Sequence, residues 1–321
     1  MMDTTREHHE LLTAIAIDYY QKGVTQEEIS KKFNISRVRV GRLLKVARDE
    51  GIVNITVNYH PVYSSDIEKR LKERFKITRA LIAIDQKDEE LQRLEVANLV
   101  STYLSRRIED DMTIAVGQGR NVASIAHGVG GSKKSCKFIS SIGGVHPRGN
   151  LFNADHICRQ LSKKFGGNSE SMYAPAYVKD KELRKSLMEV DTVKQTLLRA
   201  RKADIALVGV GDMRDNSFMV ELGWFSSQEI IDARINLGVV GDLAGYDFFD
   251  SYGNPVQTNM DDRIIGLSIN DYLNIQEVIA IASENTKSYA LLGALRSGVV
   301  DVLATSMSNA LAILSLDNDM K

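Results

Sequence analysis

The chain has 321 residues, of which 43% are hydrophobic, so it is long enough for about two domains with substantial cores. A formal net charge of -1 excludes a generally cationic nucleic-acid coat protein, and residues 1–60 hold 9 Lys and Arg against 8 Asp and Glu. Two cysteines exclude a disulfide framework, and no apolar run reaches the roughly 18 residues that a membrane span needs. We therefore expect a cytoplasmic protein with no membrane partner, metal or cofactor.

A short segment near the N-terminus, residues 23–51, has the pattern of a helix-turn-helix. Thr25 and Glu28 form a capping-box sequence that begins a first helix. Asn34 suits the left-handed conformation of a tight turn. Ser36 can cap a second helix, which the pattern ends at Gly51. A helix pair of this kind lays its second helix in the major groove of double-stranded DNA.

The second helix carries most of the basic residues of this segment. From Lys31 to Arg48 there are seven basic residues and no acidic one. The exposed N-terminal end of such a helix reads base edges, and Lys31, Lys32, Lys45 and Arg48 are placed for phosphates. The predicted DNA-contacting residues are Thr25, Gln26, Ser36, Arg37, Val38, Arg39, Arg42 and Lys45.

Gly41 lies inside this helix, where glycine costs about 1 kcal/mol relative to alanine. Two explanations are open, namely close packing on the preceding helices and close approach to DNA. Val40, Leu43, Leu44 and Ala47 are expected to face the core.

The flanking segments complete a small N-terminal domain. Residues 10–20 predict a helix behind the pair, and the alternating, β-branched stretch 52–59 predicts a wing or short strand. Pro61 marks a boundary, after which residues 64–75 predict an amphipathic connecting helix. We therefore expect a DNA-binding domain at residues 1–60 and a second domain at residues 61–321.

From residue 80 onward, apolar strand patterns alternate with helical segments. The predicted strands are 80–84, 112–116, 136–142, 204–208, 263–267, 277–282 and 300–304. The predicted helices include 90–107, 153–165, 182–200, 285–297 and 306–316. This alternation predicts an α/β domain with a parallel sheet covered on both faces, in which ligands bind beyond the carboxyl ends of the strands.

Four glycine-bearing segments are equipped for a polar ligand, and the first three follow predicted strands. They are 117–121, 143–144 with Asn153 opening the next helix, 209–212, and 238–245 with Asp242. Glycines after a strand can present backbone N–H groups to a phosphate, although such a pair is also common in simple tight turns. Lys287 begins the helix after strand 277–282, where a cation opposes the helix dipole. This position is explained by a bound anion or by an ordinary surface lysine.

The ordered set VGQGRNVASIA, SIGGV, NADHICRQL, APAYV, ADIALVGVGD, GVVGDLAGYDFFDSYGNPV and RIIGLSIN resembles the SorC family of bacterial transcriptional regulators. The resemblance extends over essentially the whole chain. It implies a winged helix-turn-helix joined to a Rossmann-like sugar-phosphate-binding domain, similar to sugar-phosphate isomerases and deaminases. It also implies a homo-oligomer, usually a tetramer, that regulates a carbohydrate-utilisation operon as a repressor.

By motif position, the resemblance implies a set of effector-binding residues. They are Gly117, Gln118, Gly119, Arg120, Asn153, Gly209, Gly211, Asp242 and Lys287. Lys287 and the glycine loop would hold the phosphate of a sugar-phosphate effector, and Asp242 and Asn153 would hold hydroxyls. Some relatives carry a Schiff-base lysine just before the Gly-Gly pair, where this chain has Ile142.

Two alternatives to a sugar-phosphate-responsive regulator stay open. One is an isomerase or deaminase with a DNA-binding head, but neither Asp212 nor Asp242 has a histidine beside it in the sequence to complete an acid–base pair. The other is a regulator that responds to a phosphorylated quorum-sensing signal.

Overall fold

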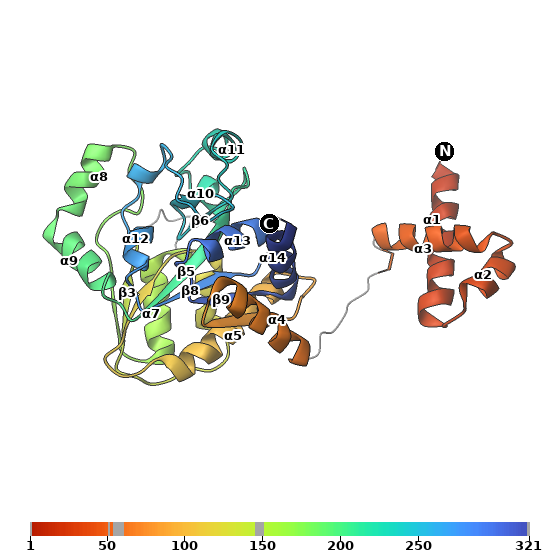
Figure 1. Cartoon of the computed structure of the whole chain (residues 1–321), viewed down its shortest axis with the longest axis horizontal. Helices are drawn as coiled ribbons and strands as arrows, with labels where there is room; N and C mark the ends of the chain where they lie inside the picture. The colour runs from red at the N-terminus through yellow and green to blue at the C-terminus, as the bar shows by residue number, and fades with distance from the viewer. Residues whose placement is uncertain (1, 51, 54–60, 145–150, 320–321) are drawn as a thin grey trace. The chain divides into compact units, whose positions relative to one another are not determined.

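The computed structural model describes residues 2–50, 52–53, 61–144 and 151–319 (Figure 1). The chain forms two compact units, Met1–Asn58 and Tyr59–Lys321, each with its own core. Within the described residues, no helix is long and apolar enough to cross a membrane.

The N-terminal unit is helical. Its elements are α1 (Met2–Ala16), continued by a π-helical segment η1 (Ile17–Gln21), α2 (Gln26–Phe33) and α3 (Arg37–Asp49). The core consists of eight apolar side chains at helical spacing: Leu12, Ile15, Ala16, Ile29, Val40, Leu43, Leu44 and Ala47. The four inward positions predicted for the second helix are therefore confirmed.

Capping residues determine where α2 and α3 begin. Thr25 accepts a hydrogen bond from the Glu28 amide, and the Glu28 side chain accepts one from the Thr25 amide in return. Asn34 ends α2 in the left-handed conformation at φ 52°, and the Ser36 hydroxyl caps α3 by accepting from the Arg39 amide. The predicted helix end at Gly51 and most of the strand predicted at 52–59 lie outside the described residues.

The second unit is built on a parallel sheet. Seven strands run in the order β1-β9-β8-β5-β2-β3-β4, and a β6–β7 hairpin pairs antiparallel with the end of β5. The strands are β1 (Arg79–Ala83), β2 (Thr113–Val116), β3 (Lys137–Ser140), β4 (Asn168–Glu170), β5 (Ile205–Asp212), β6 (Gly241–Leu243), β7 (Asp247–Phe249), β8 (Glu277–Ala282) and β9 (Val302–Ser306).

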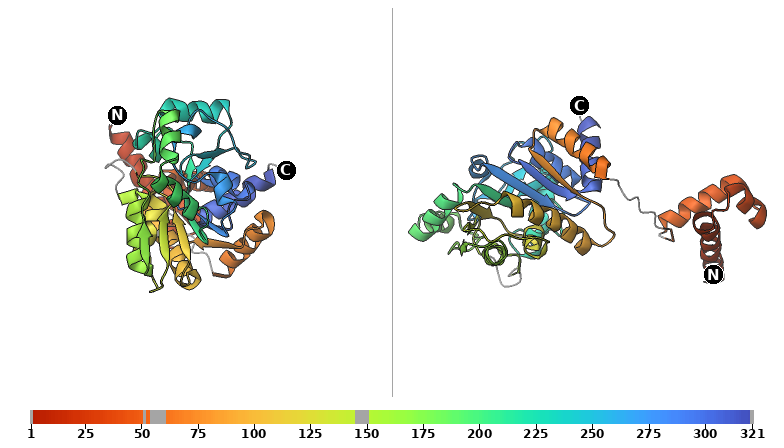
Figure 2. Two further views of the ribbon diagram at one scale, coloured as in Figure 1. Left: turned by 90° about the vertical axis from the view of Figure 1, so that its left-hand side faces the viewer. Right: turned by 90° about the horizontal axis from the view of Figure 1, so that it is seen from below.

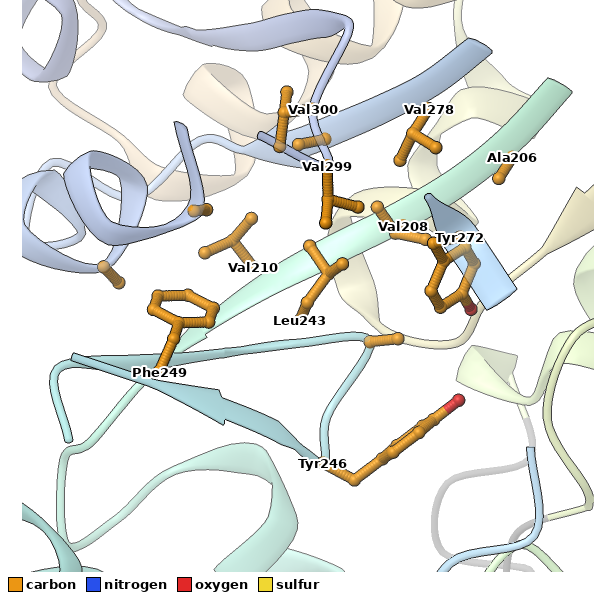
Figure 3. Close-up of a cluster of buried hydrophobic side chains, with 14 of the residues drawn as sticks. Ala206, Val208, Val210, Leu243, Tyr246, Phe249, Tyr272, Val278, Val299 and Val300 are labelled. Atoms are coloured by element: carbon orange, nitrogen blue, oxygen red, sulfur yellow. The ribbon is translucent and has the colours of Figure 1, made fainter. Parts of the chain in front are cut away.

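Helices cover both faces of this sheet, as Figure 2 shows. One face packs against α5 (Glu89–Arg107), α6 (Arg120–Ser124) and α7 (Ala154–Phe165). The other packs against α4 (Pro61–Phe75), α9 (Asp191–Ala200), α11 (Ser227–Asn236), α13 (Ser288–Arg296) and α14 (Met307–Asp319). Side chains alternate along β5, so Leu207 joins the first core and Val208 and Val210 join the second, beside Leu243 and Phe249 of the hairpin (Figure 3). The predicted α/β class with a parallel sheet is confirmed.

Several predicted elements are wrong in detail. Residues 263–267 form no strand and make only isolated bridges, Ile264 with Tyr177 and Gly266 with Ile142. The helix predicted at 182–200 is two helices, α8 (Lys181–Met188) and α9. Segment 209–212 is not a loop, because β5 continues through it by pairing with β6. That pairing is a tertiary contact that periodicity does not contain.

Candidate functional site

A pocket of the second unit lies where the strand order reverses. From β2 the chain proceeds to β3 on one side, whereas β5 lies on the other side of β2, and such a switch point opens a crevice beyond the carboxyl ends. The pocket encloses roughly 700 Å³, part of it open solvent. Its lining comes from four stretches of chain: Gln118–Asn121, Gly209–Asp212 with Arg214 and Asn216–Met219, Asp242 with Ala244 and Gly245, and Glu284 with Lys287.

Seven of the nine predicted effector residues line this pocket, and two do not. Gly117 is buried behind it, with its N–H donated to the Leu207 carbonyl at 2.8 Å. Asn153 caps α7, where its side chain accepts from the Asp155 amide at 3.3 Å. The Gly143-Gly144 pair also lies elsewhere, because both of its amides bond to the backbone of Ile265 and Ala174.

The glycine loop after β2 offers less to a phosphate than its sequence indicates. The Gly119 N–H is donated to the Phe152 carbonyl at 3.0 Å, and the Gly117 N–H is also taken. The helix that follows, α6, has only five residues, so its dipole is weak. The loop therefore contributes through the side chains of Gln118 and Arg120.

Asp242 is the most deeply buried charged group in the pocket. Gly211 pairs with Asp242 across β5 and β6, and a Cβ at Gly211 would overlap the Asp242 carboxyl, so the glycine makes room for this side chain. Burial raises the pKa of Asp242 to about 7, against the opposing effects of Lys287 and the Gly245 amide. One carboxyl oxygen, Oδ1, has no hydrogen-bond partner within the described part of the chain.

Lys287 is held in place at the N-cap of α13. Its Nζ donates to the Val210 carbonyl at 2.9 Å and lies 3.1 Å from Glu284 Oε2. Lys287 and the Asn121 amide together hold the pKa of the partly buried Glu284 at about 2, against the effect of burial. The sequence interpretation did not include Glu284, whose carboxylate already offsets the charge of Lys287 at the helix start.

The other two basic side chains of the pocket are paired as well. Arg214 Nε lies 2.8 Å from Asp212 Oδ2. Arg120 forms an ion pair with Glu221 of α10 (Phe218–Glu221) and lies over the Phe218 ring. All three cations of the pocket therefore have a protein carboxylate beside them.

Amide side chains supply the neutral polar groups. Asn121 accepts from Ser283 Oγ at 2.7 Å and donates to Glu284 at 3.0 Å, so it fixes the Glu284 carboxylate. Gln118 is buried, and neither its oxygen nor its nitrogen has a partner among the described residues. An unpaired buried amide at a pocket wall is costly unless a ligand or water bonds to it.

The turn between β6 and β7 forms one wall of the pocket. Ala244 adopts φ 58°, a left-handed conformation that is unfavourable for a side chain with a Cβ, and Gly245 follows at φ 99°. The Ala244 amide donates to the Gly209 carbonyl at 3.0 Å, which ties the turn to β5.

In the N-terminal unit, α3 presents one continuous basic face. Val38, Arg42 and Lys45 share it at positions i, i+4 and i+7, and all three are exposed. Val38 is 69% exposed, although it is apolar, and it lies at the N-terminal end of this face. Arg37 and Arg39 flank this face on opposite sides, whereas the Thr25 and Ser36 hydroxyls are used in caps.

Two features of this unit differ from the sequence interpretation. Lys32 pairs with the buried Asp18 at 2.6 Å and Lys31 lies 3.8 Å from Glu27, so neither is a free cation. A Cβ built at Gly41 would contact only Gln26 Oε1, at 3.7 Å. Close packing on the preceding helices therefore does not explain Gly41.

Sequence reasoning missed Arg214, Glu284 and Ala244 as pocket residues. Glu284 could have been found, because it lies three residues before Lys287, the spacing at which side chains meet around a helix start. Arg214 and Ala244 have no comparable signal, since the β5–β6 pairing brings them to the pocket.

Comparison with known proteins shows the family. A family described as "Putative sugar-binding domain" matches residues 59–315. The crystal structure of the putative sugar-binding domain of a transcriptional repressor from Vibrio fischeri is 50% identical. It covers 79% of this chain and 99% of its own, with a TM-score of 0.75.

Two relatives match almost the whole chain. The full-length sorbitol operon regulator SorC from Klebsiella pneumoniae is 25% identical, covers 96% of this chain and 99% of its own, and has a TM-score of 0.71. The uncharacterized transcriptional regulator YjhU of Escherichia coli strain K12 is 27% identical over 93% of this chain and 92% of its own. The chain therefore belongs to the family with this sugar-binding domain and is a SorC-type, sugar-responsive transcriptional regulator.

Proposed function

We propose that this regulator is a repressor of a carbohydrate-utilisation operon and that a phosphorylated sugar in the β2–β5 pocket controls it. One observation carries this proposal. Three basic side chains, Arg120, Arg214 and Lys287, meet in one pocket with the two hydroxyl-binding candidates Gln118 and Asp242. This is a combination of charged and neutral polar groups that suits a sugar bearing an anionic group.

The phosphate is assigned to the Lys287 side of the pocket. Lys287 is only 11% exposed, so its charge is poorly screened by water, and it lies at the N-terminus of the nine-residue helix α13. Arg214 and Arg120 lie at the more open part of the lining and can reorient toward the ligand. Gly209 and Gly211 keep the β5 wall free of side chains.

The hydroxyl groups are assigned to Asp242 and Gln118. Both have buried polar atoms without a partner in the described residues, and hydroxyls can both donate and accept. Asn153 was expected to share this role, but its side chain caps α7. Gln118 is the better candidate for binding a hydroxyl, because it lines the pocket and Asn153 does not.

The DNA-binding assignment rests on α3. We propose that Val38, Arg42 and Lys45, with Arg37 and Arg39 on the flanks, meet the major groove of double-stranded operator DNA. Gln26, the first residue of α2, is placed beside Gly41 and is assigned to the DNA backbone. A single small reading unit buries little DNA surface, so we expect a homo-oligomer, and a tetramer by analogy with the family.

An enzymatic role lacks a suitable acid–base pair. The described pocket lining contains no histidine, and Asp212 is paired with Arg214. A turnover assay on ketose, aldose and amino-sugar phosphates tests this, and sustained turnover that Asp242→Asn abolishes would assign an enzyme.

The proposed function is tested by measuring the binding of four sugar-phosphate esters and their effect on the affinity for DNA. Thermal shifts are measured with glucose 6-phosphate, fructose 6-phosphate, ribose 5-phosphate and sorbitol 6-phosphate, each beside its dephosphorylated parent. A duplex selected from a randomised library with the wild-type protein then serves as the DNA probe. We expect one ester to raise the melting temperature more than its parent and to change the affinity for the selected duplex. If no ester does either, the assignment is wrong.

A further inference from the structure

The basic side chains of the effector pocket are already paired before any ligand enters it. Each of its basic side chains lies against a carboxylate, and one carboxyl is left over. The pairs are Lys287 with Glu284, Arg214 with Asp212, and Arg120 with Glu221, and the remaining group is Asp242. A dianionic phosphate ester therefore meets three cations that are already neutralised and one buried carboxyl with no cation of its own.

Glu284 is a poor candidate for losing its charge. Glu284 has a pKa of about 2, because Lys287 and the Asn121 amide favour its ionised form. Asp212 and Glu221 each lie against an arginine. Repulsion from an incoming phosphate cannot easily be relieved by protonation of Glu284.

Asp242 differs from these paired carboxylates in its surroundings. It is 2% exposed, its Oδ1 has no partner in the described part of the chain, and burial raises its pKa to about 7. The charged groups that face it are Lys287 at the start of α13, Asp212 at the end of β5 and Asp247 in β7. Burial raises the pKa of Asp247 to about 8, so this carboxyl is mostly protonated at neutral pH and adds negative potential only as it ionises at higher pH. Near neutral pH, Asp242 can therefore gain a proton at little cost.

We propose that a phosphorylated effector binds together with one proton, which the Asp242 carboxylate takes up from solvent. This inference rests on the proposed sugar-phosphate site and specifies how that site accommodates a dianion. Protonation removes one negative charge from the pocket and leaves the Asp242 O–H free to donate to a ligand oxygen. A neutral sugar brings no charge and so causes much less proton uptake.

Linkage gives the sign of the pH dependence. The free protein loses the Asp242 proton as pH rises through about 7, whereas the phosphate complex keeps it, so affinity falls with rising pH. Between pH 7 and 8.5 we expect a loss of about tenfold, since binding of one proton gives a limiting slope of tenfold per pH unit. Phosphate monoesters have a second pKa near 6, so the ligand itself is already largely dianionic over this range.

The test is calorimetry on the full-length protein with the ester that gives the largest thermal shift among the four named above. At pH 7.5, the titration is performed in Tris and in HEPES, whose ionisation enthalpies differ, so the difference in observed heat counts protons. We expect an uptake of about half a proton or more for the wild type and close to none for Asp242→Asn. The Asp247→Asn variant is the matched control, and it should retain most of the uptake.

The outcomes separate this inference from the function on which it rests. If an ester binds but the heats agree in both buffers and affinity is constant from pH 7 to 8.5, proton coupling is wrong and the sugar-phosphate site stands. If Asp242→Asn retains the wild-type uptake, the proton goes to another group and the assignment is overturned. If none of the four esters binds at any pH, the proposed function fails and this inference fails with it.

Discussion

The two units of the chain use their basic residues in opposite ways. On α3, Val38, Arg42 and Lys45 project into solvent from one helix, and no described side chain forms an ion pair with Arg42 or Lys45. In the pocket, Lys287 is only 11% exposed, donates to the Val210 carbonyl of β5, and has the Glu284 carboxylate at 3.1 Å.

This difference bears on what each partner must do. DNA has only to displace solvent and counterions from an exposed cationic face, so its affinity follows salt concentration. An effector has to compete with charges that the protein already holds together, so its affinity should follow pH and the identity of the internal carboxylates. Substitutions in the two units should therefore differ in kind as well as in size.

The largest effect is expected from Asp242→Asn on the stability of the effector domain. The folded protein keeps a proton on Asp242 up to about pH 7, whereas the unfolded chain releases it near 3.8, so this group's contribution to stability is lost as pH rises. At pH 8 the variant should be more stable by about 2–4 kcal/mol, and at pH 4 by almost nothing.

Urea unfolding from pH 4 to 8 measures this effect, and the exposed Asp232→Asn serves as its control. If the free energy of unfolding depends on pH in the same way for the wild type and the Asp242→Asn variant, burial does not raise the pKa of this carboxyl. The proposed difference between the two units would then lose its main support.

The next effect is expected from Lys287→Met on effector binding. The variant keeps most of the aliphatic stem and removes the charge, and a charge-assisted hydrogen bond contributes about 1.5–3 kcal/mol. The affinity for the phosphate ester should fall about tenfold to a hundredfold, and the preference over the dephosphorylated sugar should largely disappear. Titrations with the ester and with the dephosphorylated sugar measure both affinities, and Lys179→Met, at an exposed lysine, is the control. If the Lys287→Met variant still prefers the ester as strongly as the wild type does, the phosphate binds elsewhere.

A comparable or smaller effect is expected from Arg42→Ala on DNA binding. Loss of one base contact should cost about 1–3 kcal/mol on the selected duplex and little on random DNA. Lys45→Ala should instead weaken both duplexes alike and reduce the salt slope by about one. Fluorescence anisotropy at several salt concentrations distinguishes the two effects. If both variants lose the same affinity on the selected duplex as on random DNA, α3 does not read the base sequence.

The smallest effect is expected from Gly41→Ala. The new methyl group meets only the Gln26 side chain, so the N-terminal unit should gain up to about 1 kcal/mol in stability. Because packing does not require the glycine, we expect the methyl group to meet DNA and to weaken binding to the selected duplex. Thermal unfolding and anisotropy on the same sample test this, with Thr13→Ala in α1 as a control for helix stability. Tighter DNA binding would contradict close approach at Gly41.

The same contrast explains how much the sequence could predict. Local sequence patterns were enough to predict the caps at Thr25 and Ser36 and the inward face of α3, because these features depend on neighbours within a few residues. The strands predicted at 204–208 and 277–282 were also predictable, because buried parallel strands are apolar throughout. Seven pocket residues could be named from glycine loops and family motifs.

What could not be predicted depends on contacts between distant segments. The extension of β5 to Asp212 requires β6, and the pairing of Arg120 with Glu221 joins residues about one hundred positions apart. The state of Asp242 depends on Gly211 and on burial in a folded core, neither of which a sequence pattern expresses. Ion pairing and desolvation are properties of the assembled pocket.

The left-handed backbone at Ala244 has a consequence for the energetics of recognition. A residue with a Cβ in this conformation carries about 1–2 kcal/mol of strain, which the tie to Gly209 and the β5–β6 ladder sustain. This wall of the proposed site is thus preorganised during folding, and little conformational entropy would remain to be lost when a ligand binds. Relaxing the turn with Ala244→Gly should therefore relieve the strain and stabilise the domain, but weaken its affinity for the sugar.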